Sequence, residues 1–272
     1  MYSLGASNRI KINMNIILEN ITKYFISNSD RQKVIALENL SLEIKESEFL
    51  CIVGPSGCGK STVINLIAGF ISPDKGKILL GKEEITSPDI NRIVVFQDHA
   101  VFPWKTVNEN IGFGLSAKLP DQQKNIIIKE LVSKMGLDGF ENKFPNELSG
   151  GMRQRVAIAR ALAVKPKIIL MDEPFSSVDQ QTRDCLQEEL LRLQNELKQT
   201  IVFVTHNIEE AMFLGDRVAV LSQRPGFIKE IFSIPFTRPR SPDLRNKIEF
   251  LEIKHKIWHL LRKEGEKQNK EL

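Results

Sequence analysis

A glycine-rich segment near residue 54 contains the residue types that bind phosphate. It fits the pattern Gly-x-x-x-x-Gly-Lys-Ser/Thr, in which glycines let the backbone curl and point its N–H groups at phosphate oxygens. A buried-strand pattern at 49–53 precedes it and a helical pattern at 61–69 follows it, and this context favours a P-loop over an ordinary glycine-rich turn. The candidate nucleotide-binding residues of this segment are Gly54, Pro55, Ser56, Gly57, Cys58, Gly59, Lys60, Ser61 and Thr62.

The side chains of this loop have separate expected tasks. Lys60 should bridge the β- and γ-phosphates of a nucleotide, and the Ser61 hydroxyl should bind Mg²⁺. The helix that begins near Lys60 adds the positive end of its dipole. The segment therefore predicts a site for ATP with Mg²⁺.

Two adjacent carboxylates follow a second buried-strand pattern, 168–171. Ligands of parallel sheets gather at the carboxyl ends of the strands, where Asp172 and Glu173 lie. Asp172 suits Mg²⁺, directly or through water, and Glu173 suits a general base that polarises an attacking water. The alternative is an acidic pair that merely ends a strand, and the P-loop upstream disfavours it.

A second candidate phosphate-binding end lies at the start of the helical run 156–162. Residues 148–155 read Leu-Ser-Gly-Gly-Met-Arg-Gln-Arg, so that Ser149, Gly150 and Gly151 stand at a helix N-terminus. The alternative is a simple helix cap. Here the chain resembles the ABC (ATP-binding cassette) ATPase family, whose signature begins Leu-Ser-Gly-Gly. The resemblance implies a head-to-tail dimer, in which each ATP lies between the P-loop of one subunit and the signature of the other.

The resemblance covers about residues 16–235 and assigns further positions. Gln97, after the strand pattern 93–96, is similar to the glutamine that contacts Mg²⁺ and the attacking water. His206 is similar to the switch histidine that contacts the γ-phosphate. Asp179 ends Ser176-Ser177-Val178-Asp179, which resembles the loop that crosses the dimer interface. Phe25 resembles the aromatic residue that stacks on adenine, with Tyr24 as its competitor.

Three stretches carry a closer resemblance, to the ATPase subunits of nitrate, sulfonate and taurine importers. They are 96–104, 148–155 and 171–175, and the segment Arg238-Pro239-Arg240 is similar too. The chain departs from the wider family at Met152 and at Ser177-Val178, which leaves the phosphate-contacting groups in place and is expected to affect rates alone. The resemblance implies import of a small anionic solute whose identity the chain does not specify.

The same resemblance implies the partners and the location. They are a second copy of the ATPase subunit, transmembrane permease subunits and, indirectly, a solute-binding protein, at the cytoplasmic side of the cell membrane. The aromatic stretch Phe102-Pro103-Trp104 either packs within its own subdomain or lines a groove for a permease helix. The alternatives for the function are an ABC transporter for another solute or an exporter, a non-transport ABC ATPase, and a P-loop kinase.

Alternating strand and helix patterns must position these residues. Strand patterns at 38–44, 49–53, 168–171, 201–204 and 218–221 alternate with helical stretches, notably 61–69 and 182–198, as in an α/β fold with a mainly parallel sheet. The family implies an N-terminal antiparallel β portion. Between about 100 and 165 the helical patterns dominate, which predicts an inserted helical subdomain. The predicted divisions are an extension at 1–15, the ATPase domain at 16–240, and a terminal helix with a polar tail at 241–272.

The terminal helix is expected to start at Ser241, with a polar, frayed tail after Lys263. The residues expected on its buried face are Leu244, Ile248, Leu251, Ile257 and Leu261.

Composition sets the remaining bounds. The 272 residues carry a net charge of +4, too mild to indicate a nucleic-acid partner. No apolar run approaches the roughly 18 residues that span a bilayer, and no signal-peptide pattern opens the chain. Three cysteines without pairing or zinc spacing fit a reducing compartment. The chain is therefore expected in the cytosol.

Overall fold

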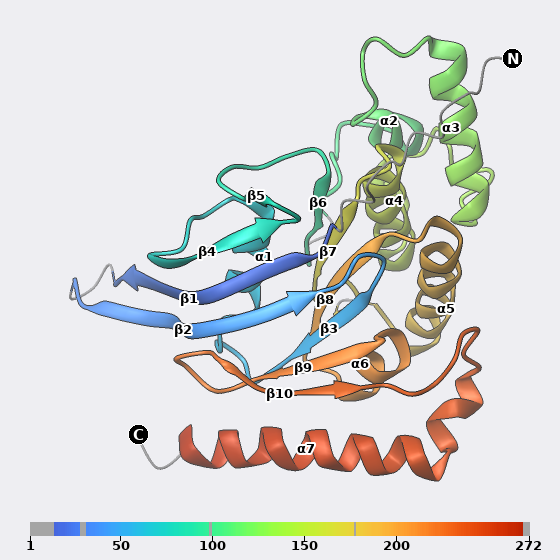
Figure 1. Cartoon of the computed structure of the whole chain (residues 1–272). Helices are drawn as coiled ribbons and strands as arrows, with labels where there is room; N and C mark the ends of the chain where they lie inside the picture. Colours follow the sequence, from blue (N-terminus) through green and yellow to red (C-terminus); the bar gives the residue numbers. More distant parts are fainter. Residues whose placement is uncertain (1–13, 28–30, 98–99, 177, 269–272) are drawn as a thin grey trace, which may run out of the picture.

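The structure is a computed structural model that describes residues 14–27, 31–97, 100–176 and 178–268. Most of the expected N-terminal extension, Asp98 and His99 of the importer-like stretch, Ser177 and the last four residues of the polar tail lie outside these ranges. Two sheets and a group of helices form one body, with the last helix along its edge (Figure 1).

The larger sheet has six strands in the order β10-β9-β3-β8-β7-β6. Its members are β10 (Ile228–Ser233), β9 (Arg217–Leu221), β3 (Phe49–Val53), β8 (Thr200–Thr205), β7 (Ile168–Asp172) and β6 (Arg92–Val95). All neighbouring pairs are parallel except β10 with β9. The predicted mainly parallel sheet is confirmed, and every residue of β3 and β8 is buried, as continuous apolar runs require.

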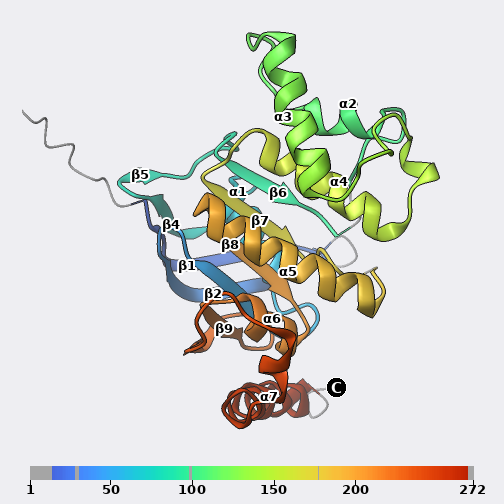
Figure 2. The ribbon, with the colours of Figure 1, turned by 90° about the vertical axis from the view of Figure 1, so that its right-hand side faces the viewer.

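Alternate residues of β3 belong to two different cores. Phe49, Cys51 and Val53 pack with α4 (Gly150–Ala163), α5 (Gln180–Leu197) and α6 (Ile208–Leu214) on one face of the sheet. Leu50 and Ile52 pack on the other face with α1 (Lys60–Ala68) and the smaller sheet. Helices on both faces of a parallel sheet make the α/β architecture (Figure 2).

The smaller sheet is antiparallel and supplies the predicted N-terminal β portion. Its order is β2-β1-β4-β5, from β2 (Lys33–Ile44), β1 (Ile16–Ile26), β4 (Lys75–Leu80) and β5 (Glu83–Glu84). The alternation read at 38–44 is present, since Leu40, Leu42 and Ile44 are all buried against α1 and its neighbours.

Helices alone occupy the described part of 100–165, as predicted. They are α2 (Val107–Gly112), α3 (Asp121–Lys134), the 3-10 helix η1 (Pro145–Glu147) and α4. Asn110 of α2 is fully buried and fixes the loop before the helix, because its side chain accepts from Phe102 N at 2.8 Å and donates to Lys105 O at 2.9 Å. The aromatic stretch is thereby held in one backbone conformation.

The prediction of a single terminal helix from Ser241 is wrong. Ser241 does cap a helix, but this is the 3-10 helix η2 (Pro242–Asn246), and α7 (Ile248–Gln268) starts only after Lys247, whose ψ of 141° is extended. Because of this break, the residues of α7 do not lie on the faces that one continuous helix from Ser241 would give them. Ile248 and Leu251, predicted on the buried face, are therefore 72% and 41% exposed, whereas Leu244 and Ile257 are buried.

The expected fraying after Lys263 is also wrong, because α7 continues to Gln268. Glu264 is buried, accepts a hydrogen bond from Gln223 N at 3.0 Å and forms an ion pair with Lys229 at 3.1 Å. These partners come from the β9–β10 region and attach the end of α7 to the sheet.

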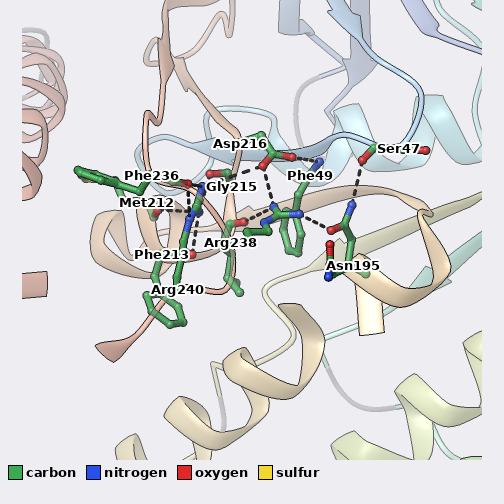
Figure 3. Close-up of polar contacts among 12 residues, drawn as sticks. Ser47, Phe49, Asn195, Met212, Phe213, Gly215, Asp216, Phe236, Arg238 and Arg240 are labelled. Atoms are coloured by element: carbon green, nitrogen blue, oxygen red, sulfur yellow. Dashed lines mark hydrogen bonds and ion pairs between the residues drawn. The ribbon is translucent and has the colours of Figure 1, made fainter. Parts of the chain in front are cut away.

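Two arginines fix the segment that leads from β10 to η2 (Figure 3). Arg238 forms an ion pair with Asp216 at 2.9 Å and also contacts Gln194 of α5. Arg240 donates to the carbonyl oxygens of Met212, Phe213, Gly215 and Phe236. Burial, followed by the neighbouring Arg238, lowers the pKa of Arg240 to about 10. The Arg238-Pro239-Arg240 segment therefore acts in this chain as a structural clamp on the C-terminal end of α6.

Candidate nucleotide site

The P-loop connects β3 to α1, as its sequence context predicted. Gly57 and Gly59 adopt φ values of 74° and 107°, a region that favours glycine. A Cβ on Gly59 would also lie within 3.1 Å of Ala36 O, so the loop depends on glycine here for space as well. The Lys60 ammonium is folded inward and donates to Gly54 O at 2.9 Å and Pro55 O at 3.0 Å.

A cleft of about 470 Å³ opens in front of this loop. It brings together residues predicted from four separate parts of the chain. Those predicted residues are Phe25, Ser56, Gly57, Gly59, Lys60, Ser61, Thr62, Gln97 and Glu173. The size suits a small organic ligand, and the loop at its floor suits phosphate.

The carboxylate pair lies at the end of β7, where the sequence placed it. Burial raises the pKa of Asp172, while the Ser61 hydroxyl that donates to it and Lys60 act in the opposite direction. Glu173 has a φ of 45°, uncommon for a residue with a side chain, and its N–H donates to Val204 O at 2.9 Å. This backbone turn directs its carboxylate toward His206.

His206 directly follows β8, and its Nδ1 lies 2.8 Å from Glu173 Oε2. The histidine side chain is 66% exposed and the Glu173 side chain only 21%. A pair of this geometry can orient a general base and leave the rest of the histidine free to contact a ligand. The two residues, 33 positions apart in the sequence, thus meet at the carboxyl ends of β7 and β8, a contact that the sequence did not predict.

The donors near the P-loop fit Mg²⁺ held jointly with a nucleotide. Ser61 is hydrogen-bonded to Asp172, and Gln97 lines the same cleft as Ser61. Within the described residues, no group of three or more His, Cys, Asp or Glu side chains could hold a metal by itself. Mg²⁺ commonly takes one or two protein oxygens, with phosphates and waters as its other ligands, so this sparse set is suitable.

The structure separates the two candidates for the adenine-stacking residue. Phe25 lines the cleft and is 44% exposed, with Lys23 Nζ 5.7 Å from its ring centre. Tyr24 points to the opposite side of β1, since neighbouring residues of a strand alternate, and Lys33 Nζ lies 3.2 Å from its ring centre. The position of Phe25 favours it for stacking on a base.

The signature residues lie outside this cleft. Ser149 caps α4 and accepts from Met152 N at 3.2 Å, and Gly150 and Gly151 form the first turn. Gly151 is buried against α5. A Cβ at this position would lie under 3.0 Å from Cγ2 of Thr182, so the close packing of the two helices depends on glycine. Asp179 caps α5 and accepts from Thr182 N at 3.0 Å. The chain therefore presents its second candidate phosphate-binding end separately from its own P-loop.

Two residues near the site were missed by the sequence analysis. Arg224, in the loop after β9, donates to Gly57 O at 3.2 Å and lines the cleft. Glu210 of α6 is buried beside the His206 turn, where it bonds to Thr205 and Gln187, and burial raises its pKa. No local pattern marks either residue, although Arg224 belongs to an Arg-Pro-Gly turn and Glu210 follows His206 by about one helical turn.

Together, the mainly parallel sheet, the glycine loop between β3 and α1, and the carboxylates at the end of β7 define a P-loop nucleotide-binding protein. Residues 37–176 match the model of the family described as ABC transporter. The chain belongs to this family, and it is an ATP-binding subunit with ATPase activity.

Three relatives are similar over most of their length. The chain is 49% identical over 257 residues to an uncharacterized ABC transporter ATP-binding protein of Methanocaldococcus jannaschii, covering 94% of both chains. It is 42% identical to the aliphatic sulfonates import ATP-binding protein SsuB of Bacillus cereus, covering 90% of this chain and 94% of SsuB. It is also 42% identical to the bicarbonate transport ATP-binding protein CmpD of Synechocystis, covering 84% and 82%.

A solved structure shares the fold. It is a dimeric, post-hydrolysis state of an ATP-binding cassette bound to ADP and Pi. The TM-score is 0.71 at 32% sequence identity, covering 82% of this chain and 100% of that one. Among the residues described here, no helix combines the length and the apolar character needed to cross a membrane.

Proposed function

We propose that this subunit hydrolyses ATP with Mg²⁺ to energise an importer of a small anionic solute. The observation that carries the proposal is the convergence of Lys60, Ser61 and Glu173 on one cleft, with His206 bonded to the glutamate. These groups correspond to the phosphate, metal and water positions of a phosphoryl transfer.

The residues of the cleft divide the reaction between them. The Lys60 ammonium exchanges its bonds to the loop carbonyls for bonds to phosphate oxygens, and so stabilises negative charge at the γ-phosphate. Ser61, Gln97 and Asp172 would hold Mg²⁺, which when bound supplies further positive charge against the phosphates. Glu173, oriented by His206, accepts the hydrogen bond of the attacking water and places it in line.

A second copy completes the site in this proposal. Ser149 and the first turn of α4 lie outside the chain's own cleft, and the free N–H groups of a helix N-terminus attract phosphate. The similar solved cassette is dimeric. A head-to-tail dimer would bring the signature of one copy to the γ-phosphate held by the other.

The dimer is tested by separating the two halves of the site. The Glu173→Gln variant should bind ATP but not hydrolyse it, and ATP should trap it as a dimer in size-exclusion chromatography. Ser149→Arg and Lys60→Ala should each abolish hydrolysis. A mixture of these two variants should recover activity, because one composite site then carries both defects and the other carries none. Heterodimers that form and stay inactive would contradict the head-to-tail arrangement, and near-normal hydrolysis by Glu173→Gln would contradict the role of the glutamate.

The transport partner is inferred from the relatives and from the surface. The names of two similar proteins refer to aliphatic sulfonates and bicarbonate, and both solutes are anions. Trp104 is 69% exposed, and its ring lies 5.6 Å from that of Phe102 at a tilted angle of 41°. Phe102 also contacts Phe113, which is 58% exposed. An exposed aromatic cluster of this kind suits a permease helix. A solute-binding protein would deliver the anion to that permease.

The solute class is tested on the assembled transporter. The tagged chain is purified from its host together with its permease, and the complex is placed in vesicles with the host's solute-binding proteins. The rate of ATP hydrolysis is then measured with sulfonates, bicarbonate, nitrate or neutral sugars. Stimulation by an anion supports the proposal, and stimulation by a neutral solute alone contradicts it.

A further inference from the structure

The last helix is attached to the protein by one face only. Phe250 and Ile257 are fully buried, and Glu264 is held by Gln223 and Lys229. Lys254 adds an ion pair to Glu209 of α6 at 2.6 Å. These contacts fix the rotation of α7 about its axis. In both Figure 1 and Figure 2, α7 lies along the edge of the molecule, and no other described helix or strand covers its far side.

That far side carries a regular row of residues, here named the outer stripe. It consists of Ile248, Leu251, His255, Trp258 and Arg262. The spacing alternates between three and four residues, which is the a/d spacing of a coiled-coil seam. Its three apolar members are 72%, 41% and 45% exposed. Large apolar side chains in this register, on a helix with its other face already buried, favour a helical partner.

The side chains at the end of the stripe are already arranged against one another. The Arg262 guanidinium lies 5.4 Å from the centre of the Trp258 ring, and the His259 ring lies 5.1 Å from it. Side chains ordered before association lose less conformational freedom on docking.

Polar side chains along the stripe select the direction of the partner. The carboxylates of Glu249 and Glu252 flank its first half, and the Lys263 ammonium and the His259 imidazole flank its second half, all of them exposed. An antiparallel copy of α7 would place Glu249 opposite Lys263 of the partner subunit and Glu252 opposite His259 of the partner subunit. A parallel copy would place like charges together.

We propose that the outer stripe is a self-association surface, on which α7 of a second copy docks antiparallel about a twofold axis near the middle of the helix. Such a contact is isologous, so each residue pair occurs twice. Leu251 packs on the alkyl stem of Arg262 of the partner subunit, and His255 packs on Trp258 of the partner subunit. The two copies of Lys256 lie near the axis on the solvent side, where water screens them.

A membrane surface fits the stripe less well. Helices that lie on anionic lipid carry Lys and Arg along the polar face. Here Glu249 and Glu252 border the first half of the stripe, next to Ile248 and Leu251. A second copy uses both charge signs, whereas an anionic lipid surface would be repelled by one of them.

The consequence for function rests on the function proposed above. One pair of helices is a small interface, so the association is expected to be weak and transient. Within an assembled transporter, such a contact would keep two ATPase subunits at a high effective concentration between cycles. The composite nucleotide sites could then close again without a new encounter in solution.

The test measures association without nucleotide. The full chain is examined in EDTA by sedimentation equilibrium at high protein concentration, because a small interface associates weakly. The parent should dimerise, and the Leu251→Glu/Trp258→Glu variant should associate at least tenfold more weakly, as expected for an interface hot spot. Ile126→Glu on α3 is the matched control, since Ile126 is 61% exposed and lies far from α7 in the sequence. It should associate like the parent.

A second set of variants tests the charge pairing with small change to the apolar surface. Glu249→Lys/Glu252→Lys should weaken association, and adding His259→Glu/Lys263→Glu should restore it, with far-ultraviolet circular dichroism checking the helix throughout. A monomeric parent, or association unaffected by the Leu251→Glu/Trp258→Glu change, overturns the proposal. Binding of the parent to anionic phosphatidylserine vesicles through the stripe, without self-association, overturns it in favour of a membrane surface.

The Glu173→Gln background distinguishes this proposal from the nucleotide-site dimer. With ATP, that variant should be trapped as a dimer whether or not the outer stripe is altered. If ATP traps no dimer, the head-to-tail arrangement fails, while the nucleotide-free measurements still decide the outer stripe.

Discussion

The contact between the signature turn and α5 leads to a prediction with a defined magnitude. In Gly151→Ala, the new Cβ would lie under 3.0 Å from Thr182 Cγ2, closer than real Cβ contacts, and both helices around it are packed in the core. Overpacking of this kind costs about 1–3 kcal/mol. Replacing a helical glycine by alanine returns at most about 1 kcal/mol. The net loss of up to about 2.5 kcal/mol should lower Tm by up to about 10 °C in a protein of this size.

Thr182→Ser provides the matched background. It removes Cγ2 but keeps the hydroxyl that bonds to Asp179, so the cap of α5 survives. The nearest atoms to the new Cβ are then the Cβ of residue 182 at 3.7 Å and Val178 Cγ1 at 3.9 Å, both ordinary contacts. Gly151→Ala should be neutral or stabilising in this background, which gives a coupling energy of at least about 1 kcal/mol. Urea unfolding of the four proteins measures it, and an equal loss in both backgrounds would refute the steric argument.

Two further predictions concern the switch region and the exposed aromatic cluster. Burial raises the pKa of Glu210 above its ordinary value of 4.5, so its contribution to stability is complete below pH 4.5 and is lost as pH rises through the folded value. Glu210→Gln lacks this loss, so its Tm relative to that of the parent should rise as the pH is raised above 4.5. A Tm difference that stays constant with pH would contradict the assignment. Trp104→Ala should leave Tm and basal hydrolysis of the isolated subunit nearly unchanged, because the side chain is 69% exposed, but should reduce co-purification with the permease. A large fall in Tm would show instead that Trp104 stabilises its own subdomain.

The sequence was most informative where one segment contains both the chemistry and its structural context. The apolar run of β3 and the glycine loop after it are contiguous, so strand, turn and helix could all be read together. The carboxylates at the end of β7 could be predicted for the same reason, because they directly follow a buried apolar run. The positions of Gln97 and His206 depended on the family resemblance, because a single polar residue after a strand has no periodicity of its own.

Contacts between distant segments explain what sequence reasoning missed. Arg224 meets Gly57 across 167 positions, and nothing near Arg224 indicates this partner. The break at Lys247 was missed because periodicity alone does not register one extended residue between two helices. Glu264 looked like part of a polar tail because its partners, Gln223 and Lys229, lie about forty residues earlier.

The way β3 is shared between two cores has a consequence for unfolding. Phe49, Cys51 and Val53 belong to the hydrophobic core beneath α4 and α5, while Leu50 and Ile52 belong to the one around α1. Neither core can lose this strand without exposing the other, so heat should melt both in one cooperative transition. The P-loop is the direct continuation of the same strand. A nucleotide that binds only the folded loop therefore raises the melting point of the α/β body as a whole, and local opening of the site is coupled to global unfolding.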